Sequence, residues 1–268
     1  MADTDTRKEQ RAAARAERAR AEAERARMRR RLWQLGGVLA IAVVVVVGIV
    51  IAAGGGGNSK PKLKAGESIP GQSETNALFA GIQQSGITVG DPKAPITVVE
   101  FADLQCPFCQ AYTTEVLAPI VAGYVRTGKV KMVFRNVAFI GTDSVRAAQM
   151  AAAAGLQNKL WQYIDLFYTN QGEENSGYVT DDFLRKVGHG VKGLDVEKAM
   201  NDRGIATVQK QLNDAQSEWT SNGFTGTPSF LIGPTGGTLK PMGANDHLSV
   251  KSMSAAIDKA LQQQQGKQ

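Results

Sequence analysis

Cys106 and Cys109 are the only cysteines of this 268-residue chain, and two residues separate them. At this spacing two cysteines can form, open and exchange a disulfide bond, provided that one sulfur ionises readily, because the thiolate is the attacking species. A framework of long-range disulfides, as small secreted domains use, needs more cysteines than these two. The pair therefore indicates redox chemistry, with one half of a zinc site as the alternative.

A zinc site built on this pair would lack ligands. Structural zinc is held by about four side chains, and a C-x-x-C pair is normally completed by a second pair at close spacing. The chain has no further cysteine, and its two histidines, His189 and His247, are isolated from each other. We interpret both histidines as ordinary surface residues. We thus expect thiol chemistry, with no metal site and no cofactor.

The segments on either side of Cys106 predict a buried strand followed by a helix. Residues 96–101 form a β-rich run that Pro95 precedes, as in a buried strand. After Cys106, apolar residues recur at helical spacing: Val116, Leu117, Ile120, Val121 and Tyr124. A helix that begins at Cys106 presents free N–H groups and a partial positive charge to that sulfur, which favours the thiolate. Cys109 lies one turn later on the same face, placed to attack a mixed disulfide and release the substrate.

The rest of the chain follows a pattern typical of an α/β fold. A long helical stretch has Leu156, Leu160, Ile164 and Phe167 on one stripe, and Thr180 is predicted to cap the next helix. We expect further helices at about 195–202, 204–222 and 247–263, and strands at 130–135, at 229–232 and near residue 239. The order is strand, helix, strand, a block of helices, two strands and a helix.

Positive charge is concentrated at the N-terminus. Residues 1–31 hold eleven Lys and Arg and six Asp and Glu, whereas the rest of the chain holds 20 and 19. Because that larger part is nearly neutral, its charge gives no reason to expect nucleic-acid binding. Residues 1–31 also lack an apolar stripe, so we interpret them as a solvated helical or disordered arm on the cytoplasmic side, compatible with contact to anionic lipids.

Residues 32–53 contain no charged side chain and include five consecutive valines. About 20 apolar residues span a bilayer as a helix, so we predict a transmembrane helix in contact with lipid, with a cleaved signal peptide as the alternative. Three arginines at 29–31 precede the span, and such clusters stay on the cytoplasmic side. Residues 54–80, which begin with four glycines, are predicted as a flexible linker. Residues 81–264 are then the folded extracytoplasmic domain of a single-pass protein of the cell membrane.

The nine residues from Phe101 to Cys109, Phe-Ala-Asp-Leu-Gln-Cys-Pro-Phe-Cys, resemble the active-site entry of DsbA-like thiol-disulfide oxidoreductases. The preceding segment 90–95 is similar to the lead-in of the membrane-anchored Gram-positive members. The resemblance covers about residues 81 to 261 and implies a thioredoxin fold. The helices predicted at about 143–222 would be the insertion that distinguishes DsbA-like proteins from plain thioredoxins.

The resemblance also implies roles for particular residues. Gly226-Thr227-Pro228-Ser229-Phe230 matches the segment in which the family has a cis proline against the active-site disulfide. Pro228 would be that proline and Thr227 would offer backbone groups to a substrate peptide, whereas the residues alone favour a trans proline at an edge strand. Pro107 and Phe108 would also contact substrate.

Glu100 is an acidic residue in an apolar strand, and its pKa should be raised if it is buried. The family implies that Glu100 accepts the proton of Cys109. The alternative is that Glu100 points outward.

These features predict an oxidase that forms disulfides in reduced secreted or membrane proteins. A membrane-embedded partner, such as a quinone-linked oxidase, would re-oxidise it. A reductase or isomerase using the same pair is the first alternative. Phe108 departs from the strongly oxidising archetype, which has histidine there, so the direction of electron flow stays open. A tethered chaperone or copper-binding module without catalysis is the alternative of another class.

Overall fold

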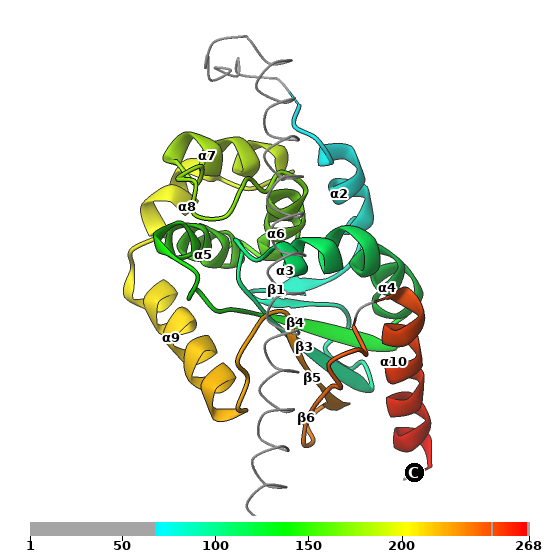
Figure 1. Cartoon of the computed structure of the whole chain (residues 1–268). Coiled ribbons are helices and arrows are strands. Elements are labelled where there is room, and N and C mark those ends of the chain that lie inside the picture. Colours follow the sequence, from blue (N-terminus) through cyan, green and yellow to red (C-terminus); the bar gives the residue numbers. More distant parts are fainter. Residues whose placement is uncertain (1–67, 248, 267–268) are drawn as a thin grey trace, which may run out of the picture. The chain divides into compact units, whose positions relative to one another are not determined.

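A six-stranded sheet forms the centre of the part of the chain that this computed structural model describes, residues 68–247 and 249–266 (Figure 1). Its order is β1-β2-β4-β3-β5-β6. β3 and β4 are parallel, and all other neighbouring pairs are antiparallel. The strands are β1 (Gln84–Ser85), β2 (Thr88–Val89), β3 (Ile96–Ala102), β4 (Val130–Asn136), β5 (Ser229–Pro234) and β6 (Lys240–Pro241).

The two central strands agree with the sequence prediction. All seven residues of β3 are buried, whereas β4 alternates between buried and half-buried residues. Because successive side chains of a strand point to opposite faces, β3 supplies two cores. Ile96 and Val98 belong to the larger core, and Val99 and Phe101 belong to a smaller one on the opposite face.

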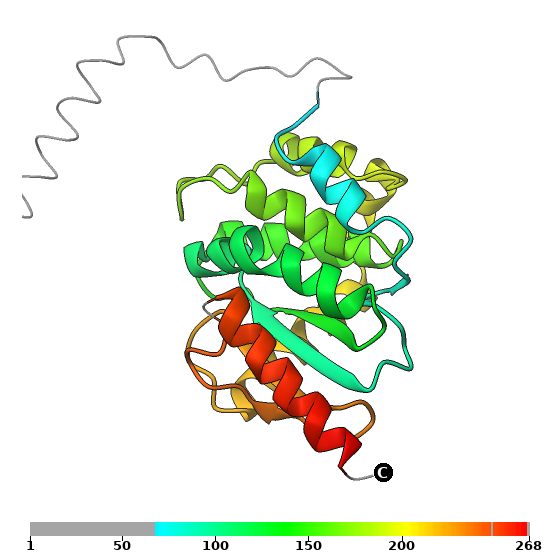
Figure 2. The same ribbon diagram turned by 90° about the vertical axis from the view of Figure 1, so that its right-hand side faces the viewer.

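Helices cover both faces of the sheet (Figures 1 and 2). One face carries α10 (Val250–Gln265) and the continuous helical segment formed by α3 (Pro107–Tyr112), η1 (Thr113–Leu117), α4 (Ala118–Ile120) and η2 (Val121–Val125), in which η1 and η2 are π-helical. The opposite face carries α9 (Ala206–Ser221), whose Ala215 enters the smaller core. Pro119 has no N–H for the usual helical hydrogen bond, which accounts for a change of helical pitch beside it.

The block of helices between β4 and β5 contains α5 (Thr142–Gly155), α6 (Leu160–Thr169), α7 (Asp181–Gly190), α8 (Val196–Asp202) and α9. Thr180 caps α7 as predicted, since its side chain accepts from Phe183 N. The prediction that Leu156 shares one helical stripe with Leu160, Ile164 and Phe167 is wrong. α5 ends before Leu156, which is 40% exposed, and Asn158 adopts a left-handed conformation that turns the chain into α6. Asparagine tolerates that conformation better than most residues.

The folded domain begins before the predicted boundary at residue 81. Helix α2 (Gln72–Leu78) lies within the segment 54–80 that the sequence indicated as a linker. Ile69, Thr75 and Phe79 are buried, and Thr75 donates to Asp165 of α6 at 2.5 Å. Two apolar residues and one polar contact in so short a segment gave no clear period from which to predict this helix.

The predicted cytoplasmic arm 1–31 and the predicted transmembrane helix 32–53 lie outside the described residues, as does most of the predicted linker. Among the helices that are described, none is long and apolar enough to cross a membrane.

Candidate active site

Cys106 lies at the point where β3 ends and α3 begins. It is the N-cap residue of α3, and its N–H donates to the Asp103 carbonyl at 3.0 Å, which closes a tight turn after the strand. Pro107 occupies the first helical position, where no N–H is required. Cys106 is 5% exposed, and Cys109, one turn further along, is fully buried. Both are free thiols. The predicted strand, turn and helix around the pair are therefore confirmed.

The sheet brings Thr227 and Pro228 to the same place from the other end of the domain. β5 runs antiparallel to β3, with Ser229 opposite Phe101, so the residues just before β5 lie beside the end of β3. The peptide bond between Thr227 and Pro228 is cis, which the family resemblance implied and the residues alone did not. The Cys106 thiol donates to the Thr227 carbonyl at 3.3 Å. Residues more than a hundred positions apart thus meet at one sulfur.

Hydrogen bonding lowers the pKa of Cys106 to about 6. The largest cause is the hydrogen bond from the Cys109 side chain, and the backbone N–H groups of Cys109 and Phe108, in the first turn of α3, act in the same direction. Burial acts against them. The Thr227 side chain also lowers this pKa, whereas the Thr227 carbonyl, an acceptor, can bond only to the neutral thiol. The balance makes Cys106 largely ionised at neutral pH, as an attacking or leaving sulfur in disulfide exchange must be.

Cys109 has the opposite character. Burial raises its pKa well above 9, and the neighbouring Cys106 and the charge of Glu100 raise it further. A sulfur of this kind reacts only after a base has removed its proton. The pair therefore combines one ready thiolate with one protected thiol.

Glu100 lies inside the domain beneath the pair. It is 1% exposed and its side chain has the same parity along β3 as Ile96 and Val98, which places it on the face covered by α3. Burial alone raises its pKa to about 8. Its Oε1 atom has no hydrogen-bond partner, and no ion pair to Glu100 occurs among the residues that the structure describes. The outward-pointing alternative is wrong.

Exposed apolar side chains lie near the buried sulfurs. Phe108 is 72% exposed and Pro107 is exposed as well, so the two residues between the cysteines face solvent. Phe139 is 47% exposed; its ring stacks on Trp219 at 5.4 Å between centroids, and the Trp219 Nε1–H donates to the Gly226 carbonyl at 3.4 Å. Exposed aromatic side chains at such a position suit contact with apolar segments of another protein.

The inserted helices hold the active-site turn through residues to which sequence reasoning gave no role. Tyr168 Oη donates to the Asp103 carbonyl at 3.0 Å, and Gln171 Nε2 donates to the carbonyls of Leu104 and Cys106 at 2.8 and 3.3 Å. The buried Asp103 carboxylate in turn accepts from the backbone N–H groups of residues 139 and 140. Asp103 lies within the motif Phe101–Cys109, but its hydrogen-bond partners are distant in sequence. Only its position close to the cysteines could therefore have indicated its role.

The two histidines differ from each other. His189 is exposed, as predicted. His247 is half-buried, and its ring packs on Phe230 with centroids 5.1 Å apart, so the surface interpretation is wrong for this residue. Burial lowers the pKa of His247. Within the described residues no group of three or more potential metal ligands occurs.

Alkylation of the reduced protein with iodoacetamide should follow the ionisation of Cys106. We expect the rate at Cys106 to rise with pH to a midpoint of about 6, instead of about 8.5 for a free cysteine. Mass spectrometry of quenched samples separates the two sulfurs, and Cys109 should stay unmodified up to pH 9. The denatured protein is the control, in which both sulfurs should titrate near about 8.5. A midpoint above 8 at Cys106 in the folded protein would contradict this assignment.

Comparisons with known proteins agree with this geometry. The thioredoxin family model matches residues 83–259. A protein of Bacillus cereus named probable disulfide bond formation protein D is 30% identical over 189 residues, which cover 69% of this chain and 82% of that one. Disulfide bond formation protein D of Bacillus subtilis is 26% identical over 146 residues, covering 54% of this chain and 66% of that one.

Solved structures share the fold. A thioredoxin-like oxidoreductase from Silicibacter pomeroyi superimposes with a TM-score of 0.52 at 27% identity, covering 70% of this chain and 97% of that one. Oxidised BdbD from Bacillus subtilis gives a TM-score of 0.58 at 22% identity, with coverages of 67% and 96%. At that identity the second likeness concerns the fold alone.

Proposed function

Because this chain belongs to the thioredoxin family and is a DsbA-like thiol-disulfide oxidoreductase, we propose that it oxidises cysteine pairs in other proteins outside the cytoplasm. As an enzyme of this family it acts on proteins with cysteines and exchanges electrons with a redox partner. Cys106 and Cys109 carry the reaction in this proposal. Membership of an enzyme family also argues against the non-catalytic chaperone or copper-binding module.

The observation that carries the direction of the reaction is the low pKa of Cys106. A stabilised thiolate stabilises the reduced enzyme, and a stabilised reduced form makes the corresponding disulfide a stronger oxidant. The name of the relative from Bacillus cereus, a disulfide bond formation protein, points the same way. Phe108 gives the thiolate neither charge nor a side-chain hydrogen bond, so the stabilisation comes from Cys109, the Thr227 side chain and the helix backbone.

The proposed reaction proceeds through a mixed disulfide. A substrate thiolate attacks Cys106 Sγ of the oxidised enzyme, the Cys106–Cys109 bond breaks, and Cys109 leaves with the electron pair. A second substrate thiolate then attacks the substrate sulfur of the mixed disulfide, and Cys106 leaves as a thiolate. The substrate has lost two electrons and gained a disulfide, and the enzyme is a dithiol. A membrane-embedded partner, such as a quinone-linked oxidase, removes those two electrons to restore the enzyme disulfide.

Glu100 is proposed to serve the proton transfers of Cys109. With a pKa of about 8 the carboxyl is mostly protonated at neutral pH and can donate to the departing Cys109 sulfur, which is buried and has a raised pKa. During re-oxidation the carboxylate accepts that proton again. Pro228 and Thr227 are proposed to align the substrate backbone beside Cys106, and Pro107 and Phe108 to contact its side chains.

The location outside the cytoplasm is part of the proposal. Its support is the uncharged segment 32–53 behind the arginines at 29–31, which together favour a membrane anchor whose C-terminal side faces outward. An anchor of this kind keeps the domain beside the bilayer and beside a membrane-embedded redox partner.

Equilibration of the cysteine pair with mixtures of reduced and oxidised glutathione tests the direction. We expect a potential above that of thioredoxin, about −270 mV, and shifted toward that of DsbA, about −120 mV. Phe108→His is a matched variant that adds a donor to the thiolate and should shift the potential further toward the oxidising end. In cells, rapid alkylation should find the pair mainly oxidised. A pair that is mainly reduced in cells, with a potential near that of thioredoxin, would support the reductase or isomerase instead.

A further inference from the structure

The side-chain amide of Gln171 bridges the two chain segments that meet at Cys106. Gln171 follows α6, and its Nε2 donates to the Leu104 carbonyl at 2.8 Å and to the Cys106 carbonyl at 3.3 Å. The first carbonyl belongs to the turn after β3, and the second belongs to the residue that caps α3. One side chain from the inserted block of helices is therefore bonded to the backbone on both sides of the Cys106 side chain.

The two carbonyls depend on Gln171 to different degrees. Leu104 is fully buried, and within the described part of the chain no other donor reaches its carbonyl. The Cys106 carbonyl also accepts from Gln110 N at 3.1 Å, in the first hydrogen bond of α3. Because a buried carbonyl without a donor is unfavourable, the bond to Leu104 fixes the turn against the segment that carries Gln171.

Further hydrogen bonds connect the end of α6 to the same place. The Tyr168 carbonyl accepts from Gln171 N at 3.2 Å and from Gln110 Nε2 of α3 at 3.0 Å. The Tyr168 side chain donates to the Asp103 carbonyl at 3.0 Å. The turn after β3, the first turns of α3 and the end of α6 thus form one hydrogen-bonded unit.

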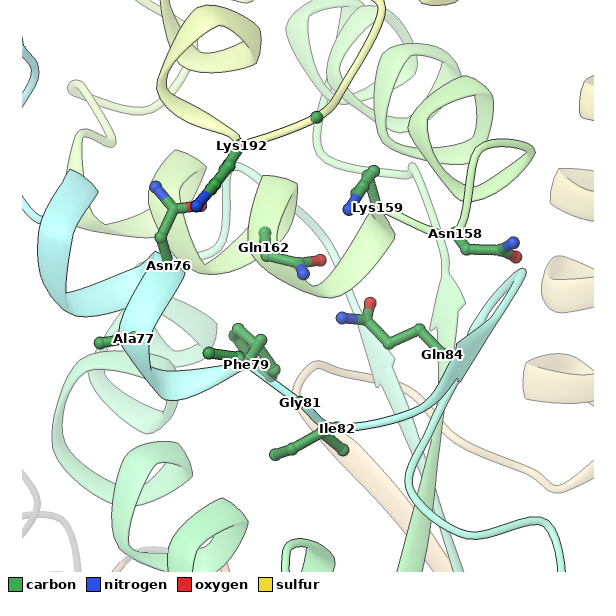
Figure 3. A pocket seen from close by; sticks show the side chains of 12 residues that line it. Asn76, Ala77, Phe79, Gly81, Ile82, Gln84, Asn158, Lys159, Gln162 and Lys192 are labelled. Atoms are coloured by element: carbon green, nitrogen blue, oxygen red, sulfur yellow. The ribbon is translucent and has the colours of Figure 1, made fainter.

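The beginning of α6 takes no part in this unit. Gln162, in the first turn of α6, extends into a hollow between α2, α6 and β1, and none of the residues that contact the cysteines lines that hollow (Figure 3). Contact with the cysteine pair is therefore a property of the end of α6, and Gln162 offers a control on the same helix.

The ionised sulfur of Cys106 depends on the direction of two backbone N–H groups. Those of Phe108 and Cys109, in the first turn of α3, bond to the sulfur and lower the pKa of Cys106. First-turn N–H groups have no partner inside their own helix, so their direction relative to the sulfur depends on how the turn joins the helix. A disulfide carries no charge for them to stabilise. Whatever keeps them aligned therefore favours the dithiol form over the disulfide.

We propose that Gln171 is a positioning residue for thiol-disulfide exchange. Its two hydrogen bonds hold the turn after β3 in register with the first turn of α3, so that the N–H groups of Phe108 and Cys109 face the Cys106 sulfur. Gln171 donates to backbone carbonyls, so it acts on the reaction through Cys106. This inference rests on the exchange reaction proposed for the same pair, but it does not depend on the direction of that reaction.

Equilibration of the full chain, in detergent micelles, with reduced and oxidised glutathione tests the inference. Gln171→Met keeps the length of the side chain and removes both donors. We expect its equilibrium constant to shift about tenfold toward the enzyme disulfide, which corresponds to about 30 mV toward the reducing end. Since the same thiolate is destabilised, the midpoint of Cys106 alkylation by iodoacetamide should rise by about one pH unit.

Tyr168→Phe is a second, milder variant of the same unit. It removes the donor to the Asp103 carbonyl, which keeps its bond from Cys106 N at 3.0 Å, so no carbonyl is left without a partner. Both measured quantities should shift in the same direction as in Gln171→Met, by a smaller factor.

Two glutamines outside this unit provide matched controls. Gln157 also makes two hydrogen bonds, both at 2.9 Å, to the backbone of Asp195, and Gln162 lies at the other end of α6. Gln157→Met and Gln162→Met should leave the glutathione equilibrium constant and the alkylation midpoint of Cys106 unchanged. A fall in the unfolding temperature of Gln157→Met would show that loss of stability by itself does not alter either quantity.

The inference is overturned if Gln171→Met unfolds at a lower temperature but keeps both quantities of the unchanged protein, because Gln171 then has a structural role only. If Gln171→Met does not fold, Tyr168→Phe decides by the same criterion. Equal shifts in Gln157→Met would also overturn the inference. The absolute potential of the unchanged protein tests the direction of electron flow, whereas differences between variants test Gln171, so each proposal can fail without the other.

Discussion

Replacing Cys106 by serine is expected to lower the rate of disulfide transfer to a reduced protein on the order of 10³-fold or more. A serine hydroxyl does not ionise near neutral pH and forms no disulfide, so neither the enzyme disulfide nor the mixed disulfide with substrate can exist. Re-oxidation of reduced, unfolded ribonuclease measures the rate. Serine is nearly isosteric with cysteine and can keep the hydrogen bond to the Thr227 carbonyl, so the reduced proteins should unfold within a few degrees of each other.

Cys109→Ser is the matched control because it removes the other sulfur. Cys106 keeps its thiolate but lacks the neighbour that resolves a mixed disulfide, so covalent complexes with substrate should accumulate on non-reducing gels. Cys106→Ser should form none. If Cys109 instead forms the complexes in the Cys106→Ser protein, the roles given to the two sulfurs are reversed. If Cys106→Ser keeps full activity, the pair is not the catalytic centre.

The largest expected effect on stability comes from Glu100. Folding raises the pKa of this carboxyl from 4.5 to about 8, so the folded protein binds its proton more tightly than the unfolded chain does. The stability associated with the protonated carboxyl is complete below pH 4.5 and is lost as the pH rises toward 8. The pKa difference corresponds to at most about 5 kcal/mol above pH 8. Glu100→Gln should remove this dependence, and Glu100→Leu should in addition raise the unfolding free energy at pH 8.

Urea denaturation of the oxidised protein at several pH values from 4.5 to 8.5 measures this effect as the difference between the variants and the unchanged protein. Glu100→Gln should also slow the steps that move a proton at Cys109 by about tenfold to a hundredfold. Asp165→Asn is the matched control, because Asp165 is another buried carboxyl with a pKa raised by burial, to about 6, but it bonds to Thr75. It should change the pH dependence of stability and leave the exchange rate unchanged. Equal exchange rates for Glu100→Gln and the unchanged protein would exclude Glu100 from proton transfer.

Local sequence patterns predicted the parts of the fold in which one physical cause dominates. The β-rich run before Cys106 predicted β3, because a strand buried on both faces is apolar throughout. The alternation after residue 130 predicted β4, because a strand buried mainly on one face alternates. The cysteine spacing gave the reacting pair. The cis bond before Pro228 required the family resemblance, since its local sequence does not distinguish it from an ordinary X-Pro bond.

The parts that were missed depend on contacts between distant segments. Helix α2 is too short to show a period and is held by its contacts with α6, such as that of Thr75 with Asp165. The predicted stripe is interrupted after Gly155 because a turn, closed by the bond from Lys159 N to the Ala154 carbonyl, separates α5 from α6. The acceptors in the turn after β3 are backbone carbonyls, which every residue has, so no residue type marked them.

That turn has a consequence for how such a centre can be transplanted. Besides the local bonds from Cys106 N and Gln110 N, the carbonyls of residues 103, 104 and 106 accept hydrogen bonds from Tyr168 and Gln171, at and just beyond the end of α6. A short peptide grafted into another scaffold would copy the two sulfurs and the local bonds of the turn, but it would lose the distant side-chain donors. A working transplant of this centre therefore needs two separate segments: the nine residues of the motif, and the segment at the end of α6 that carries Tyr168 and Gln171.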